Sequence, residues 1–464
     1  MTLDQLPPAV ERPGYRRGGI ETGVVHIGPG AFHRAHQAVV FDDILRRGDR
    51  RWGVTGLSLR SQGPRNALEP QDGLYALSVS EAGETRRRVI GAIRSVMTLE
   101  NDVAPLVGML ADASTRLVTL TITEAGYAAP MPGGPATAAG LLADALGVRR
   151  ARGLPGLTIL ACDNLEGAGG RLETLVSTAA ARIDPKLPEW IEAYVRFPGC
   201  MVDRITPAAT EADITDFANE TGVEDRALVR TEAFSQWVIE DRFAGPRPEF
   251  EAVGVQVVGD VAPFSRAKLR LLNGAHSAMA YLGGLAGLTF VHEFVRDPAG
   301  AAYVERLWDE AQATLDPAPG LDLADYRAQL TARFRDASIS HRLAQIAIDG
   351  SLKLPPRLVS ALTIRIERGL SSPAIVLAIA AWMKGQSGRD DAGNPVELQD
   401  ARADDLRRRL AGLSEPKDRV LALLDVESIF PPGLAANAPL RTDLTRTLAR
   451  LDAEGARAAL IKPA

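Results

Sequence analysis

The residues from 23 to 59 constrain the fold of this chain more than any other stretch. An apolar run from Gly23 to Ile27 leads into the glycine turn of HIGPGAFHRAH, and a helical pattern follows from Phe32 to Arg47. A second strand pattern covers Trp52 to Leu59. Strand, glycine turn, helix and strand in this order form the βαβ unit of a mononucleotide-binding fold. We therefore predict an α/β chain with an N-terminal Rossmann-type domain.

Two further apolar runs, Arg116 to Thr123 (RLVTLTIT) and Leu157 to Cys162 (LTILAC), have the composition of buried strands. Their hydrophobicity is nearly continuous and helical patterns separate them, which favours a mostly parallel sheet covered on both faces. Val253 to Val258 is interpreted as a later strand. All of these strands belong to a predicted first domain, residues 1–264.

From about residue 265 onward, helical periodicity punctuated by Pro and Gly dominates the chain. The predicted helices run from Ala301 to Leu315, Leu323 to Ala337, Pro355 to Gly369, Ala374 to Lys384 and Ala401 to Leu413. Between the last two, Ser387 to Pro395 (SGRDDAGNP) is predicted to be an exposed loop. We therefore predict a mainly α-helical C-terminal domain, residues 265–464.

Composition excludes several classes of protein. The 464 residues are 46% hydrophobic and 24% charged with a net charge of −5, and no Lys/Arg cluster with interleaved aromatics suggests nucleic-acid binding. The longest apolar run, Pro373 to Met383, is too short for a membrane span. Two cysteines and no apolar leader at the N-terminus favour a cytoplasmic protein. We expect a monomer or a small homo-oligomer that binds a small molecule.

The glycine turn is a candidate phosphate-binding site. Gly28 would allow the tight turn, and Gly30 would let the backbone approach a pyrophosphate at the start of the helix. The third glycine of the usual pattern is replaced by His33. His33 and His36 are interpreted as packing residues of the first helix, with contact to the cofactor as the alternative. The predicted cofactor-binding residues of this turn are Ile27, Gly28, Gly30, Ala31 and Phe32.

The end of the second strand leaves the choice of dinucleotide open. It reads SLRSQ from Ser58 to Gln62, without the carboxylate that usually grips the ribose 2′-hydroxyl of NAD. Arg60 would suit the 2′-phosphate of NADP, or it could simply face solvent. We predict NAD as the cofactor, with NADP as the alternative.

The segment KLRLLNGAH carries three polar residues with complementary chemistry. On an α-helix at about 100° per residue, Lys268, Asn273 and His276 fall within an arc of roughly 140°. A lysine that takes a proton, an amide that holds an oxygen and an imidazole that orients a hydroxyl would suit metal-free alcohol oxidation. A surface lysine, a helix-capping asparagine and a core histidine are the simpler interpretations.

Five motifs in order, HIGPGAFHRAHQA, TLTITEAGY, CDNLEGAGG, MVDRITP and KLRLLNGAHSAMAYLG, resemble the mannitol dehydrogenase family. This family contains polyol-specific long-chain dehydrogenases and the related fructuronate reductases. The resemblance extends from about Arg12 to beyond Arg357. It implies a Rossmann-type domain, an α-helical C-terminal domain and a metal-independent, nicotinamide-dependent alcohol/ketone oxidoreductase.

The resemblance also implies roles for individual residues. Lys268 matches the general acid/base, Asn164 of CDNL and Asn273 match the amide pair that holds the reacting oxygen, and His276 matches the residue that positions the substrate. Asp203 of VDRITP and Lys353 of DGSLKLP match substrate-binding residues. Without the family, Asn164 and Asp203 could simply organise turns, and Asp203 could pair with Arg204.

Two further features concern the cofactor and metals. Glu124 follows a predicted strand, where ligands gather in open α/β sheets, so it could line the nicotinamide site or form a turn. No zinc is implied, because neither cysteine lies in a C-x-x-C motif and the chain has no H-E-x-x-H.

The residues before Lys353 bear on the substrate. Mannitol-oxidising relatives carry an arginine and a histidine where this chain has Gln345 and Ile348, and QIAxDGSxKLPxR looks more like the fructuronate reductase branch. Lys353 and Arg357 could then meet a substrate carboxylate, although Arg357 could instead cap a helix. We predict interconversion of D-mannonate and D-fructuronate. The alternatives are a polyol 2-dehydrogenase (mannitol/fructose, arabinitol/xylulose or sorbitol/fructose) and, more remotely, a non-catalytic nucleotide-binding protein.

Overall fold

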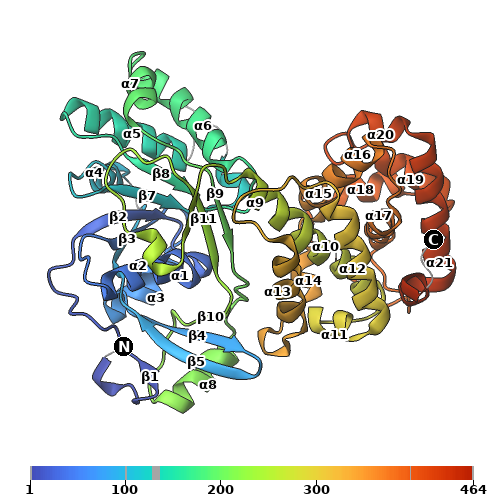
Figure 1. The fold of residues 1–464 in the computed structure, drawn as a ribbon, viewed down its shortest axis with the longest axis horizontal. Helices are drawn as coiled ribbons and strands as arrows, with labels where there is room; N and C mark the ends of the chain where they lie inside the picture. Colours follow the sequence, from blue (N-terminus) through green and yellow to red (C-terminus); the bar gives the residue numbers. More distant parts are fainter. Residues whose placement is uncertain (1–2, 100–101, 128–135, 398, 462–464) are drawn as a thin grey trace. The chain divides into compact units, whose positions relative to one another are not determined.

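The computed structural model describes residues 3–99, 102–127, 136–397 and 399–461. The chain divides into two compact units, Met1–Ala262 and Pro263–Ala464. The sequence-predicted boundary lies two residues further along the chain. Strands are concentrated in the first unit, and the second is built of helices (Figure 1).

A five-stranded parallel sheet forms the centre of the first unit. Its strand order is β6-β3-β2-β7-β8, and every neighbouring pair is parallel. The strands are β2 (Thr22–Ile27), β3 (Gly53–Ser58), β6 (Ile93–Thr98), β7 (Leu117–Leu120) and β8 (Thr158–Ala161). The first of these strands along the chain, β2, lies in the middle of the sheet, and the chain moves to the other side of β2 after β6. This order is that of a Rossmann-type half sheet and confirms the predicted fold class.

Both faces of this sheet are buried. Val24, Val54 and Leu117 point into one apolar core with helix α2 (Gln37–Arg46). The neighbouring residues Val25 and Val118 point into a second core, which contains α5 (Ala138–Ala151) and α6 (Ala168–Ile183). Because side chains alternate along a strand, burial on both faces requires nearly continuous apolar runs, as the sequence showed.

Two smaller sheets accompany the central one and were not predicted as such. One has the order β1-β5-β4-β10 and the other β12-β11-β9. Their strands are β1 (Val10–Glu11), β4 (Tyr75–Glu81), β5 (Glu84–Ile90), β9 (Cys200–Asp203), β10 (Val229–Glu232), β11 (Gln236–Glu240) and β12 (Gln256–Val258). β4 and β5 form an antiparallel hairpin, and the charged sequence of β5, ETRRRVI, concealed its strand character.

The remaining elements of the first unit are short helices. They are η1 (Leu3–Gln5), α1 (Ala31–Ala35), α3 (Gly63–Leu68), η2 (Glu69–Gln71), α4 (Ala104–Leu110), η3 (Glu124–Tyr127), α7 (Leu187–Tyr194), α8 (Glu211–Thr221) and η4 (Phe250–Val253). Helix α9 (Ala262–Ala267) begins at the boundary, and all of its residues after Ala262 belong to the second unit.

The predicted helix from Phe32 to Arg47 is interrupted at His36, which separates α1 from α2. The backbone of His36 leaves the helical region, with φ −123° and ψ −86°. Its ring is fully buried, with Nε2 2.9 Å from the carbonyl oxygen of Gln236 and an edge-to-face contact with Trp237. The tertiary contacts of this one imidazole therefore accompany a break that periodicity could not reveal.

The second unit consists of helices around two buried central ones, α10 (Gly274–Leu285) and α17 (Pro373–Gly385). Its other elements are η5 (Lys268–Asn273), α11 (Val291–Arg296), α12 (Pro298–Gln312), α13 (Leu323–Arg335), η6 (Ala337–Ile339), α14 (Leu343–Ala347), α15 (Gly350–Leu354), η7 (Pro355–Val359), α16 (Ser360–Glu367), α18 (Ala403–Leu410), α19 (Pro416–Leu424), α20 (Pro432–Ala436) and α21 (Ala438–Ile461). Among the described residues, no helix is both long and apolar enough to cross a membrane.

Candidate active site

A cavity of about 380 Å³ opens at the carboxyl ends of β2, β7 and β8. Its lining is Gly28, Gly30, Ala31, Phe32, Thr121, Ile122, Thr123, Tyr127, Cys162, Asp163, Asn164 and Leu165. Ligands of open α/β sheets bind at this edge, beside the strand where the chain changes direction. Four of the predicted cofactor residues and Asn164 thus lie around one cavity.

Gly28 and Gly30 contribute to this cavity in different ways. Gly28 has φ +91°, and a Cβ there would lie 2.2 Å from the carbonyl oxygen of Thr121. A Cβ on Gly30 would have the Gly28 carbonyl oxygen, 3.9 Å away, as its nearest described neighbour. Gly28 is therefore required by the fold itself, whereas Gly30 leaves open space of the kind that a closely approaching phosphate needs.

His33, which stands in place of the third glycine, is accommodated under the turn. Its fully buried ring stacks on that of His26, with centroids 3.4 Å apart and an interplanar angle of 15°. The ring nitrogens of His26 lie 2.7 Å from Thr119 Oγ1 and 2.9 Å from Thr121 Oγ1. Burial lowers the pKa of His26 to about 3, so the ring is neutral near pH 7. These contacts support packing roles for both rings.

The other three predicted cofactor residues stand differently. The side chain of Ile27 is 1% exposed and packs in the core, so this residue could meet a cofactor only through its backbone. Arg60 is exposed beyond the end of β3 and is not among the residues that line the cavity. Glu124 begins η3, but its side chain lies outside what the structure describes.

Asp163 organises the cavity and was not singled out from the sequence. One carboxylate oxygen accepts a hydrogen bond from the backbone N–H of Ile122 (2.6 Å), and the other accepts one from the hydroxyl of Tyr127. The loop after β8 is thereby tied to the loop after β7. The signal was present in the CDN triplet, where Asp163 precedes the exposed Asn164.

Asp203 is the last residue of β9 and is 1% exposed. Its neighbour Arg204 donates hydrogen bonds to the carbonyl oxygens of Ala35 (2.6 Å) and Glu232 (3.0 Å). Burial is the main reason that the pKa of Arg204 falls to about 10. This half-buried arginine thus joins the end of β9 to α1 and to β10, beside the candidate substrate-binding aspartate.

The KLRLLN segment is a π-helix, not the α-helix that the sequence argument assumed. Element η5 covers Lys268–Asn273, and α-helix resumes at Gly274. In an α-helix, residues five apart differ by roughly 140° around the axis. In a π-helix, hydrogen bonds join residues five apart, so Lys268 and Asn273 come closer to one line along the axis. The side chains of Lys268 and Asn273 are 6% and 9% exposed.

Side chains of neighbouring segments support this wide turn. The indole N–H of Trp308, on α12, donates to the carbonyl oxygen of Leu271 (2.9 Å). Arg270 donates to the carbonyl and hydroxyl oxygens of Thr314 (2.6 and 2.9 Å). These bonds satisfy a polar backbone group of the irregular turn and anchor the turn to the end of α12.

A second π-helix, η7, carries Arg357 and packs against the first. The predicted helix from Pro355 to Gly369 begins with this π-turn and continues as α16, and α15 leads directly into it. Pro355 and Pro356 lack the N–H groups that α-helical hydrogen bonds would use at this point. A Cβ on Gly274 would lie 3.0 Å from the carbonyl oxygen of Arg357, and the Arg357 guanidinium donates to Ser277 Oγ (3.1 Å). Arg357 therefore lies beside the helix that carries His276.

Lys353 lies on α15, the short helix immediately before η7. Its ammonium group donates a hydrogen bond to the carbonyl oxygen of Ile346 on α14 (3.3 Å), seven residues earlier in the chain. The side chain is therefore held against α14, the helix that includes Gln345.

The ring of His276 is 5% exposed and lies among basic groups. It contacts Phe334 (centroids 4.9 Å apart) and meets His341 edge to face (4.8 Å, 90°). Burial is the main cause that lowers the pKa of His276, and His341, Arg357, Arg333 and Lys268 lower it further. All four named neighbours are basic residues. The structure thus brings Lys268, Asn273, His276 and Arg357 together within the helical unit.

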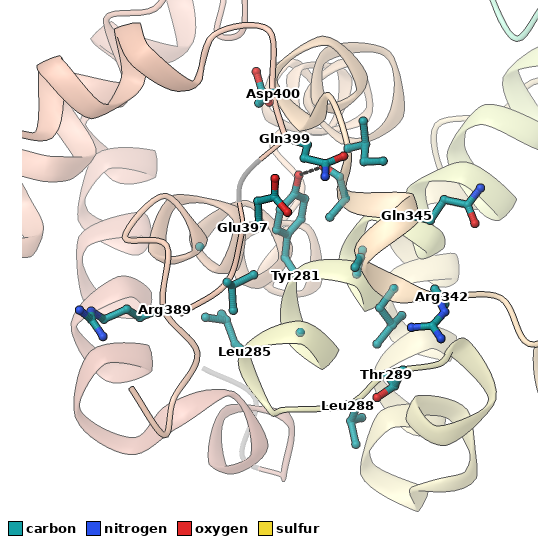
Figure 2. A pocket seen from close by; sticks show the side chains of 18 of the residues that line it. Tyr281, Leu285, Leu288, Thr289, Arg342, Gln345, Arg389, Glu397, Gln399 and Asp400 are labelled. Atoms are coloured by element: carbon teal, nitrogen blue, oxygen red, sulfur yellow. Dashed lines mark hydrogen bonds between the residues drawn. The ribbon is translucent and has the colours of Figure 1, made fainter. Parts of the chain in front are cut away.

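A second cavity, of about 420 Å³, lies in the helical unit, between the end of α10, α14 and residues 385–389, 396–397 and 399–400 (Figure 2). Gln345 and Ile348 are among its lining residues, and the Gln345 side chain points away from Tyr281. The Tyr281 hydroxyl donates to the carbonyl oxygen of Ala347 (3.1 Å). Lys268 and His276 are not among the lining residues that the structure describes.

No group of three or more His, Cys, Asp or Glu side chains that could hold a metal ion occurs among the described residues. Cys162 and Cys200 form no disulfide with each other, and their sulfur atoms lie 3.8 Å apart.

Two family models cover most of the chain. The Mannitol dehydrogenase Rossmann domain matches residues 22–252, and the Mannitol dehydrogenase C-terminal domain matches residues 260–452. The chain is 36% identical to the D-mannonate oxidoreductase of Escherichia coli strain K12, over 97% of each chain. It is 34% identical to a mannitol 2-dehydrogenase of Phaeosphaeria nodorum, over 97% of this chain and 82% of that one.

Solved structures give the same result. The mannitol 2-dehydrogenase of Pseudomonas fluorescens, in a ternary complex with NAD and D-mannitol, superimposes with a TM-score of 0.91. It is 35% identical, and the match covers 99% of this chain and 97% of the other. The predicted resemblance is therefore confirmed: this chain belongs to the mannitol dehydrogenase family of oxidoreductases.

Proposed function

We propose that this protein is a metal-independent, NAD-dependent oxidoreductase that interconverts a secondary alcohol and a ketone in a sugar acid of the D-mannonate/D-fructuronate type. The observation that carries the sugar-acid proposal is the set of basic groups around His276. Lys268, Arg333 and Arg357 all lower the pKa of its imidazole, which means that positive potential reaches this ring from three helical segments. A carboxylate substrate is attracted to such a region, and arginine is well suited to bind one.

The cavity at the ends of β2, β7 and β8 supports the proposed NAD site. Gly28, Gly30, Ala31 and Phe32 would hold the pyrophosphate, for which the space beside Gly30 is suited. When bound, the nicotinamide accepts or donates a hydride. Arg60 and Glu124 remain candidates for cofactor contacts, and NADP remains the alternative cofactor.

Each remaining polar residue has a proposed role taken from the family. Lys268 is the general base for alcohol oxidation and the general acid for ketone reduction, while His276 orients the substrate. Asn164 and Asn273 donate amide N–H bonds to the reacting oxygen, as in an oxyanion hole. Substrate binding involves Asp203, Lys353 and Arg357. A lysine that accepts a proton near neutral pH must be removed from water or lie beside another cation, and Lys268 is buried.

The second candidate function is a polyol 2-dehydrogenase. The structural match at a TM-score of 0.91 to an enzyme solved with D-mannitol favours it. Identities of 36% and 34% to the D-mannonate and mannitol enzymes do not separate the two substrates. Gln345 and Ile348, in place of the arginine and histidine expected for mannitol oxidation, weigh toward the sugar acid.

Substrate preference can be measured directly. We expect kcat/KM to be about tenfold higher, or more, with D-fructuronate than with D-fructose, when the oxidation of NADH is monitored by its absorbance. These two ketoses differ only at the carbon farthest from the reacting end, where one has a carboxylate and the other a hydroxymethyl group. D-xylulose and tagaturonate complete the panel, and NADPH replaces NADH in a parallel series. Clear preference for a neutral ketose would contradict the sugar-acid proposal.

The acid/base role predicts the behaviour of Lys268→Ala. This variant should bind NADH with unchanged affinity, measured by fluorescence titration, because Lys268 is not among the described residues that line the proposed cofactor cavity. Its kcat should fall by about three orders of magnitude or more, and added primary amines should restore part of the activity. Retention of near-normal kcat would show that another group moves the proton.

A further inference from the structure

His341 has no role in the function proposed so far, yet its position is well defined. It precedes α14, and its carbonyl oxygen accepts a hydrogen bond from the N–H of Val291 (3.0 Å). The next residue, Arg342, forms an isolated antiparallel bridge with Phe290. The backbone on both sides of the imidazole is therefore fixed to the start of α11.

His341 and His276 each hold a buried ring nitrogen that has no hydrogen-bond partner within the described part of the chain. These atoms are Nδ1 of His341 and Nε2 of His276, and Oδ1 of Asn273 is a third such atom. The two rings meet edge to face with centroids 4.8 Å apart. Buried polar atoms normally have partners, so three unsatisfied atoms in one small region indicate a site completed by a ligand.

The charges around the two rings indicate what this ligand is. Burial lowers the pKa of both imidazoles, Arg333 lowers both further, and the pKa of His341 is about 4. Both rings are therefore neutral near pH 7, and each unpaired nitrogen donates or accepts according to its tautomer. A hydroxyl group both donates and accepts one hydrogen bond, so it can satisfy two such nitrogens together.

We propose that His341 contacts the substrate, and that its Nδ1 and the Nε2 of His276 together bind one hydroxyl group of a polyhydroxy ketone or alcohol. This inference rests on the proposed function, since it supposes that the substrate binds at Lys268, Asn273 and His276. It adds a specificity residue, because a substrate without this hydroxyl leaves two buried nitrogens unsatisfied. Such sites reject deoxy analogues strongly.

The test combines three variants with a series of substrates. Asn places an amide near the position of the imidazole Nδ1, Gln places one near Nε2, and Leu has neither. We expect His341→Leu and His341→Gln to lower kcat/KM by about tenfold to a hundredfold with the preferred ketose, and His341→Asn to recover most of it. His292→Leu is the matched control, because His292 stacks on Phe290 in the same region and has no proposed contact with the substrate.

Monodeoxy analogues of the preferred ketose then identify the hydroxyl. For the unmodified enzyme, removal of one particular hydroxyl from the substrate should lower kcat/KM by about the same factor as His341→Leu does. In the His341→Leu variant, removal of the same hydroxyl should leave kcat/KM almost unchanged, because both changes delete the same interaction. NADH affinity and the thermal midpoint should stay near those of the unmodified enzyme in every variant.

Two outcomes would overturn the proposal and can be told apart. In the first outcome, the unmodified enzyme turns over a polyhydroxy ketone, but each deoxy analogue lowers kcat/KM by the same factor in His341→Leu as in the unmodified enzyme. His341 then does not bind a hydroxyl, and the proposed function stands. If the unmodified enzyme binds NADH but turns over no sugar, sugar acid or polyol, the proposed function fails and the His341 proposal fails with it.

Discussion

At the scale of single residues, the two glycines of the phosphate turn show how one motif serves two purposes. Gly28 has a left-handed φ of +91°, and a Cβ at this position would overlap the backbone of Thr121, the residue that follows β7. Gly30 has ordinary backbone angles, with φ −74° and ψ −173°. The first glycine is thus required for folding, and the second is open to a ligand.

This difference predicts opposite behaviour for two alanine substitutions. Gly28→Ala should lower the free energy of unfolding by at least about 1–3 kcal/mol, because a strained φ is combined with a close contact to backbone. Gly30→Ala should leave stability nearly unchanged and weaken NADH binding. Thermal unfolding and fluorescence titration of NADH separate the two effects. A stable Gly28→Ala variant, or an unfolded Gly30→Ala variant, would contradict this assignment.

At the scale of elements, the two π-helices define the geometry of the candidate active site. Element η5 carries Lys268 and Asn273, and η7 carries Arg357. The π-turn changes the angular relation of residues five apart, so the acid/base candidate and the amide candidate share a face more closely than in an α-helix. π-turns occur often at functional sites, and here each coincides with predicted site residues.

The hydrogen bond from Trp308 to the Leu271 carbonyl predicts that η5 depends on α12. Trp308→Phe should lower kcat by about tenfold, because an unsatisfied carbonyl releases the turn that carries Lys268. The variant should also lose about 1–3 kcal/mol of unfolding free energy in addition to the effect of the smaller side chain, because one buried carbonyl is left without a hydrogen-bond partner.

Trp382→Phe is the matched control for this prediction. Both indoles are fully buried, but Nε1 of Trp382 has no hydrogen-bond partner among the described residues. Its replacement should therefore reduce stability through packing alone and leave kcat nearly unchanged. Steady-state kinetics and thermal unfolding of the two variants provide the comparison. Equal losses of kcat in both would show that the indole bond does not hold the turn.

At the scale of the whole molecule, histidine burial links stability to pH. Four of the six histidines in the sequence, at positions 26, 33, 36 and 276, are buried. His26 illustrates the effect, since its pKa in the folded protein is about 3 and its ordinary value is 6.5. Between these values the unfolded chain binds a proton that the folded chain does not. The stability contributed by neutral His26 is therefore complete above pH 6.5 and is lost as the pH falls toward 3.

The size of this effect can be predicted for one variant. On going from about pH 7 to about pH 5, His26 alone should cost the unmodified protein about 2 kcal/mol of unfolding free energy. His26→Asn should be less stable at pH 7, because it loses bonds to Thr119 and Thr121, but its loss between the two pH values should be smaller by that amount. Urea unfolding followed by circular dichroism measures both, with the half-buried His292→Asn as control. Equal pH slopes would exclude His26 as the titrating group.

The sequence by itself determined the fold class, the family and four strands of the central sheet, β2, β3, β7 and β8, whereas β6 was not predicted. These follow from local features, namely apolar β-branched runs, a glycine turn and motifs whose residues are close in sequence. The predicted strands ended one to three residues beyond the observed ones at several ends, as for Arg116 to Thr123 against Leu117–Leu120. The hairpin of β4 and β5 escaped detection because the charged residues of β5, ETRRRVI, hide its strand character.

Only the tertiary structure decided how the site residues are positioned relative to one another. The break at His36 depends on Gln236 and Trp237, some 200 positions away, and the π-turn at Lys268 is held by Trp308 and Arg270. The partnership of His276 with His341 joins segments separated by 64 intervening residues. Local propensity records which conformations are favourable for a segment, but long-range contacts select among them, and the chemistry of the site depends on that selection.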